Sequence, residues 1–191
     1  MRAPRLSPAS TLAGVLVGED ARRLPLSESE FLAMYARTAG PLIGYLRRLT
    51  GDPSVAEDLL QDAYIRFLSL GRVPETDDHQ KNYLFRIATN LARDHFRAMR
   101  RRDRLVDADG ERSSVPVEDA GDVFALFAHV SARDRELLLL AYVEGLTHQE
   151  IAQVTGLMRA SVRLLLFRAR KRFAAVLSAA GLGPVPFGKD A

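Results

Sequence analysis

The sequence predicts an all-α protein with two small helical domains joined by a flexible acidic linker, the C-terminal one containing a helix-turn-helix. Apolar residues recur at helical intervals on both sides of an acidic stretch, and no strand pattern of comparable length occurs. The 191 residues suffice for two small domains with a core each. We expect a flexible extension (1–25), an N-terminal domain (26–102), a linker (103–121), a C-terminal domain (122–180) and a tail (181–191).

The N-terminal domain is expected to hold three helices. The first spans about 27–49, around an interruption at Gly40–Pro41, and the second spans about 54–70. Both open with a serine followed three residues later by a glutamate, which is the spacing of a capping box. Residues 71–78 contain glycine, proline and three acids and predict a loop. The third helix spans about 80–101, with an apolar stripe on one side and arginines outside it.

The C-terminal domain is expected to hold four shorter helices, at 123–130, 131–145, 147–154 and 159–178. The last two are separated by Gly156, and the final one is strongly basic. A short capped helix, a glycine turn and a basic second helix are typical of a helix-turn-helix, whose second helix enters the major groove of DNA. A plain helical hairpin with a solvated basic face is the alternative.

Composition excludes several classes of function. The chain has no cysteine, which excludes a disulfide framework, a thiolate zinc site and thiol catalysis and fits a reducing cytoplasm. Four scattered histidines do not suggest a metal site. The apolar stretch 12–17 is too short to span a bilayer, so we expect a soluble protein without direct membrane insertion. We expect no catalytic residue, no metal and no cofactor.

The charges are placed unevenly along the chain. Residues 93–104 contain six arginines against two aspartates, and residues 159–172 contain five arginines and a lysine with no acid. Between them, residues 103–122 contain seven acids against two arginines. Although the net charge is only +3, two concentrated basic segments are typical of a protein that binds a polyanion such as DNA.

Two motifs resemble a known family. "GDPSVAEDLLQDAYIRFL" followed by "NYLFRIATNLARDHFR" resembles the N-terminal domain of the extracytoplasmic-function (ECF) subfamily of the sigma-70 family of RNA polymerase sigma factors. "GLTHQEIAQVTG" followed by "SVRLLLFRARKRF" resembles their C-terminal domain, so that the likeness covers about 31–177. The resemblance implies a cytoplasmic, non-enzymatic alternative sigma factor that binds core RNA polymerase, promoter DNA and an anti-sigma factor, and that directs promoter-specific transcription initiation.

The resemblance also assigns roles to residues. An acidic and amide face of the second helix is implied to bind core polymerase: Glu57, Asp58, Gln61 and Asp62. Polar and basic residues of the third helix are implied to contact the −10 element: Asn90, Arg93, Arg97, Arg100 and Arg101. Residues of the last helix are implied to contact the −35 element: Arg159, Ser161, Arg163 and Arg168. The loop 70–80 corresponds to the one that captures a flipped −10 base, and flipping costs a few kcal/mol of stacking.

Several features of the sequence admit two interpretations. Leu164 and Leu165 stand where relatives have a polar Ser-Arg pair, and Met158 replaces a small polar helix cap. Recognition of the −35 element then relies on the basic residues with thymine-methyl contacts, or an apolar patch serves a protein partner. Tyr83 is a core residue or a stacking platform. The acidic linker mimics a transcript in the polymerase channel or is a plain tether. A sigma-like decoy or adaptor that binds an anti-sigma regulator without productive promoter recognition is the alternative function.

Overall fold

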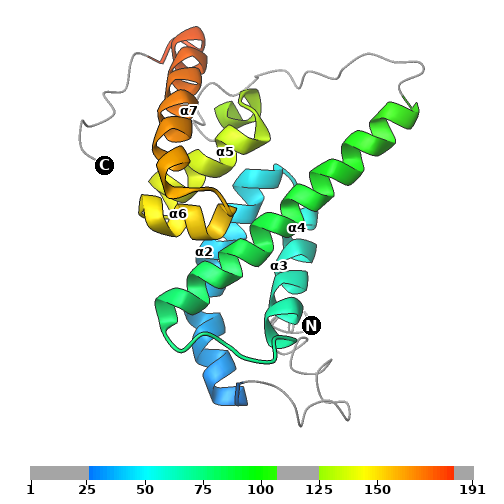
Figure 1. Ribbon diagram of the computed structural model, residues 1–191. Helices are drawn as coiled ribbons and strands as arrows, with labels where there is room; N and C mark the ends of the chain where they lie inside the picture. The colour runs from blue at the N-terminus through cyan, green and yellow to red at the C-terminus, as the bar shows by residue number, and fades with distance from the viewer. Residues whose placement is uncertain (1–25, 107–124, 183–191) are drawn as a thin grey trace, which may run out of the picture.

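The fold is that of a computed structural model, which describes residues 26–106 and 125–182. These residues form helices and connecting turns without any strand, so the all-α prediction is confirmed for them (Figure 1). The expected extension 1–25, residues 107–121 of the linker and residues 183–191 of the tail lie outside the described residues. The elements in chain order are α2 (Glu28–Thr50), α3 (Pro53–Leu68), α4 (Asp77–Val106), η2 (Ala125–His129), α5 (Ala132–Leu138), η3 (Leu139–Val143), α6 (His148–Thr155) and α7 (Arg159–Ala179).

Helix α2 begins as the sequence predicts but is not interrupted. The Ser27 hydroxyl oxygen accepts a bond from the backbone N–H of Glu30, and the Glu30 carboxylate accepts one from the backbone N–H of Ser27, which completes the capping box. The expected interruption at Gly40–Pro41 is wrong, because Pro41 lies inside a continuous helix. A proline removes one backbone hydrogen bond, but Thr38 and Leu42 on either side of it are buried, and this packing holds the helix together.

The junction between α2 and α3 differs from the sequence expectation. Gly51 ends α2 with φ of 75°, a left-handed conformation that glycine adopts without strain. Helix α3 then begins at Pro53, and the carboxylate of Asp52 accepts bonds from the backbone N–H groups of Ser54 (2.8 Å) and Val55 (3.2 Å). Asp52 therefore caps the helix, and the capping box expected at Ser54 is wrong.

Helix α4 is the longest element and crosses the whole molecule. It begins at Asp77 and ends at Val106, several residues beyond each expected end, so the first four residues of the expected linker are helical. Figure 1 shows its C-terminal part extending away from the other helices. Leu84, Phe85 and Ala88 on its apolar side are fully buried, and the helix packs against α2, α3 and α6.

The C-terminal module contains the expected helix-turn-helix. A π-helical turn, η3, continues α5, and α6 follows with a complete capping box between Thr147 and Glu150. Gly156, with φ of 71°, turns the chain from α6 into α7. At the base of this module the guanidinium of Arg172 on α7 donates two bonds of 2.7 Å to the buried carboxylate of Asp134 on α5.

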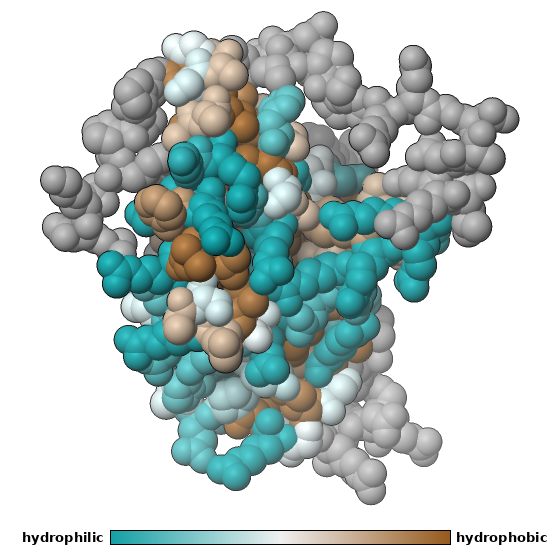
Figure 2. All heavy atoms as spheres, turned by 45° about the horizontal axis from the view of Figure 1, so that its top comes forward, coloured by the Kyte–Doolittle hydropathy of each residue, from teal (hydrophilic) through white to brown (hydrophobic). Residues whose placement is uncertain are grey.

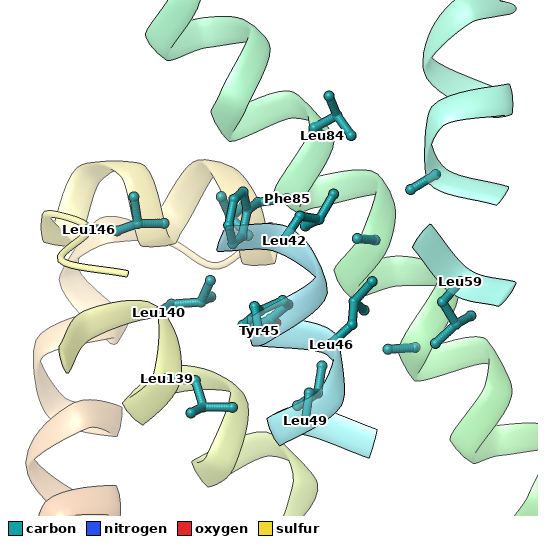
Figure 3. Packing of buried hydrophobic residues seen from close by; sticks show 14 of the residues in the cluster. Leu42, Tyr45, Leu46, Leu49, Leu59, Leu84, Phe85, Leu139, Leu140 and Leu146 are labelled. Atoms are coloured by element: carbon teal, nitrogen blue, oxygen red, sulfur yellow. The ribbon is translucent and has the colours of Figure 1, made fainter. Parts of the chain in front are cut away.

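The two modules share one hydrophobic core. Leu139, Leu140 and Leu146 of the C-terminal module pack toward Tyr45 of α2 and Phe85 of α4 (Figure 3). All five are buried, and the hydroxyl of Tyr45 is hydrogen-bonded to Thr89 at 3.0 Å. The apolar surface removed from water between the modules contributes about 25 cal/mol per Å². The modules are therefore docked against each other as well as joined along the chain. None of the described helices is both long and apolar enough to cross a bilayer.

The ion pair between Asp134 and Arg172 makes the stability of the C-terminal module depend on pH. The hydrogen bonds from Arg172 hold the pKa of the Asp134 carboxyl below its ordinary value. A lowered folded-state pKa stabilises the fold above the unfolded-state pKa, about 4, and that stability is lost as the pH falls through the folded-state value. Asp134→Asn should therefore lower the free energy of unfolding at pH 7, and the difference from wild type should shrink below pH 4 in urea titrations.

The control variant for this pH dependence is Glu75→Gln, which removes a carboxylate from an exposed pair with Arg72. Exposed ion pairs contribute little to stability, so this variant should have the same free energy of unfolding as wild type at pH 3 and at pH 7. An Asp134→Asn deficit that stays the same at pH 3 and pH 7 would show that shape rather than charge holds this contact.

Candidate nucleic-acid and protein interfaces

Helix α3 presents a polar row to solvent. All four residues that the sequence singled out on it are exposed, while the opposite face packs into the core: Glu57, Asp58, Gln61 and Asp62. Glu57 accepts a 2.8 Å bond from the exposed guanidinium of Arg47. Because these groups lie one turn apart on a rigid helix, they offer a regular acidic and amide surface to a basic partner.

Helix α4 carries the second candidate surface. Four of its five expected contact residues are exposed: Asn90, Arg97, Arg100 and Arg101. Arg97 forms an ion pair with Asp94, one turn earlier. Asn90 can donate and accept hydrogen bonds, whereas the arginines can only donate, which suits base edges and phosphates respectively.

The fifth residue, Arg93, contacts the other module. Its guanidinium donates two bonds to Glu136 on α5, at 2.6 and 2.9 Å, and a third of 3.0 Å to the backbone carbonyl of Thr155 at the end of α6. Burial raises the pKa of the Glu136 carboxyl, and the bonds from Arg93 oppose that rise. Arg93 thus neutralises a buried acid, and any contact of Arg93 with DNA requires these bonds to break.

Other contacts between the modules were not anticipated from the sequence. Arg135 donates to the carbonyl of Leu49 on α2 at 2.9 Å and to that of Phe127 at 2.8 Å. Asn82 on α4 donates to Glu150 of α6 at 3.2 Å. A signal was present, because four consecutive charged residues, 133–136, precede an apolar run and cannot all face water on one short helix.

Helix α7 carries the third candidate surface. Arg159, Arg163 and Arg168 are exposed, and Ser161 is half-buried. The residue at the N-cap, Met158, makes no side-chain hydrogen bond to the helix, as its apolar side chain predicts. Figure 2 turns the top of the molecule, where α7 lies in Figure 1, toward the viewer. It shows apolar surface lying between hydrophilic surfaces there.

The two leucines that depart from the family pattern have different environments. Leu165 is partly buried against the core, whereas Leu164 is 51% exposed. The reason is helix geometry, because a helix with buried Val162 and Leu166 turns residue 164 away from the core.

Two hollows lie near the expected DNA-contacting residues. A cleft of about 330 Å³ between the modules is lined by four arginines, of which Arg93, Arg97 and Arg100 come from α4 and Arg133 from α5. A shallower hollow of about 360 Å³ is bordered by the loop that follows α3, the expected base-capturing loop.

Tyr83 is partly buried, with its ring 6.3 Å from that of Phe67, which favours its interpretation as a core residue. Within the described residues, no three His, Asp or Glu side chains are grouped as metal ligands.

Comparison with known proteins identifies both modules. The family model for Sigma-70 region 2 matches residues 34–102, and the model for Sigma-70, region 4 matches residues 121–173. The fold is thus that of a sigma-70-type protein.

Individual relatives narrow the assignment. The ECF RNA polymerase sigma factor SigC of Mycobacterium tuberculosis is 30% identical over 128 residues, which cover 62% of this chain and 68% of SigC. The ECF sigma factor SigI of the same species is 30% identical over 159 residues, which cover 75% of this chain and 54% of SigI, so that the chain spans about half the length of SigI. The chain belongs to the ECF sigma factors of the sigma-70 family.

A solved structure shares the fold. The sigma factor RpoE of Bartonella quintana, crystallised in complex with the anti-sigma factor NepR, superposes with a TM-score of 0.61 at 22% identity. The match covers 78% of this chain and 96% of RpoE. At this identity the likeness concerns the fold alone.

The contact between Arg93 and Glu136 is expected to control how tightly the modules associate. Arg93→Ala leaves the buried Glu136 carboxylate without its partner and should lower the free energy of unfolding by about 1–3 kcal/mol. It should also increase the radius of gyration measured by small-angle X-ray scattering, because the modules separate. Arg97→Ala, an exposed arginine on the same helix, is the control and should change neither quantity. An unaltered radius in Arg93→Ala would show that the apolar contacts suffice to hold the modules together.

Proposed function

We propose that the chain is an alternative RNA polymerase sigma factor that binds core polymerase and directs promoter-specific transcription initiation. The observation that carries the proposal is the position of three polar surfaces on different helices, α3, α4 and α7, with none of them needed to cover the core. The family membership supports the same function. The protein contributes binding energy rather than chemistry, and we assign it no catalytic residue, metal or cofactor.

The proposal divides the work among these three surfaces. The acidic and amide row of α3 binds core polymerase, where opposite charge on the partner steers the encounter. Asn90 and the arginines of α4 contact the −10 element, and the loop after α3 receives an unstacked base. The basic face of α7 docks into the major groove at the −35 element, as the second helix of a helix-turn-helix does. Arg93 takes part only when the modules separate.

Two further elements of the proposal concern regulation and location. The solved sigma factor RpoE was crystallised with an anti-sigma factor, which supports an anti-sigma partner for this chain as well. A protein that works with polymerase on promoter DNA acts in the cytoplasm.

The direct test of the proposed function is in vitro transcription with cognate core polymerase on a promoter library. Specific initiation supports the proposal, and its absence together with tight binding to a regulator supports the decoy function instead.

The division of labour predicts opposite defects in two sets of variants. Asn90→Ala combined with Arg97→Ala should weaken promoter opening about tenfold or more, because each polar contact to DNA is worth about 1–3 kcal/mol. The same variant should retain its affinity for core polymerase. Charge reversal at Asp58 and Asp62 to lysine should instead weaken polymerase binding about tenfold or more, measured by fluorescence anisotropy of labelled protein.

The control for charge reversal is Glu28→Lys, an exposed acid on α2. It should bind polymerase and open promoters as wild type does. Loss of both activities in each set of variants would contradict the assignment of separate surfaces.

A further inference from the structure

An apolar pair lies on the outer face of α7, where the fold does not need it. Leu164 is 51% exposed and Phe167 is 57% exposed. They are three residues apart and therefore adjacent on the helix surface. The core side of the same helix is already filled by Val162, Leu166 and Ala169, which are buried. A single exposed apolar residue is ordinary, but two adjacent ones form an apolar patch, and such a patch on a helix-turn-helix is a candidate contact surface.

The charges around the pair select the kind of partner. Arg163 and Arg168 are exposed beside it, Lys171 is exposed one turn beyond Phe167, and no acid occurs in residues 159–172. A purely basic border favours a polyanion, because phosphates accept bonds from arginine and lysine. An apolar centre within this border cannot pair with phosphates and needs an apolar group between them.

Duplex DNA meets both requirements at once. In the major groove, thymine presents a 5-methyl group, and apolar side chains contact it. The first half of the second helix of a helix-turn-helix is the part that faces base edges, and Leu164 and Phe167 both lie in the first half of α7. A protein partner would have to place acids around an apolar centre, whereas thymine-containing DNA has this arrangement in its major groove.

We propose that Leu164 and Phe167 determine the sequence specificity of −35 recognition by contacting thymine 5-methyl groups, while Arg163 and Arg168 hold the flanking phosphates. The inference rests on the proposed function and adds the base that α7 prefers. Leu164 then recognises a base through apolar contact instead of hydrogen bonds. The −35 element of this factor contains thymine at the positions that the two side chains reach.

The test removes the methyl group and nothing else. Holoenzyme made from the full chain and cognate core polymerase first selects binding sites from DNA randomised upstream of a fixed −10 element. Each thymine of the selected −35 sequence is then replaced by deoxyuridine, which pairs identically but lacks the 5-methyl group. At the contacted thymines, deoxyuridine should weaken wild-type binding about fourfold, the factor corresponding to about 0.8 kcal/mol for burial of one methyl-sized group.

Variants separate apolar readout from phosphate contact. At the thymine that Leu164 contacts, Leu164→Ser should bind thymine and deoxyuridine equally, with the affinity that wild type has for deoxyuridine there, whereas the preference at the thymine contacted by Phe167 should remain. Leu32→Ser changes an exposed leucine on α2 and should keep the wild-type preference. Arg163→Ala should weaken both DNAs by the same factor and should reduce the dependence of binding on salt, because a phosphate contact carries no base preference. Circular dichroism of each variant checks that the helices remain folded.

The outcomes distinguish this inference from the function on which it rests. Selected −35 sequences that wild type binds equally with thymine and deoxyuridine overturn the thymine assignment and leave the sigma factor function standing. The same holds if Leu164→Ser keeps its promoter affinity but no longer binds a protein regulator. If holoenzyme selects no −35 sequence at all, both the inference and the proposed promoter recognition are wrong.

Discussion

The docking of the two modules is the constraint on which the rest of this structure depends. Leu139 and Leu140 enter the core beside Tyr45, and the hydrogen bonds of Arg93 to Glu136 cross the same boundary. Burying a carboxylate is costly unless a cation and hydrogen bonds compensate for it, so Glu136 requires Arg93 in this arrangement. The positions of all three candidate surfaces relative to one another follow from this contact.

Helix α4 has two competing uses. One face packs against α2, α3 and α6, and the arginines near its exposed side are the expected DNA contacts. Arg93 lies at the edge between these faces and is engaged with Glu136 and the end of α6. Arg100 is exposed toward solvent, and Arg97 has only to release its exposed ion pair with Asp94 to reach a phosphate. The energetic cost of using α4 for DNA is therefore concentrated at one residue.

Local sequence signals predicted local structure well and failed where neighbours intervened. The capping boxes at Ser27 and Thr147 are present as predicted, because both partners lie within one turn. The expected break at Pro41 is wrong, since tertiary packing outweighs the loss of one backbone bond. The cap of α3 is Asp52 and not the predicted Ser54, because Pro53 occupies the first helical position and shifts the boundary.

The all-α class, the order of the helices, the helix-turn-helix and the polar face of α3 can all be predicted from the sequence alone, because each depends on periodicity or capping within a few residues. The folded arrangement is needed to show that the modules share a core, that Arg93 neutralises Glu136, and that Leu164 faces water while Leu165 packs inward. These features depend on contacts between residues that are far apart in the chain, or on which side of α7 is turned toward the core. No local pattern fixes which buried charge meets which partner, and three-dimensional packing alone settles that choice.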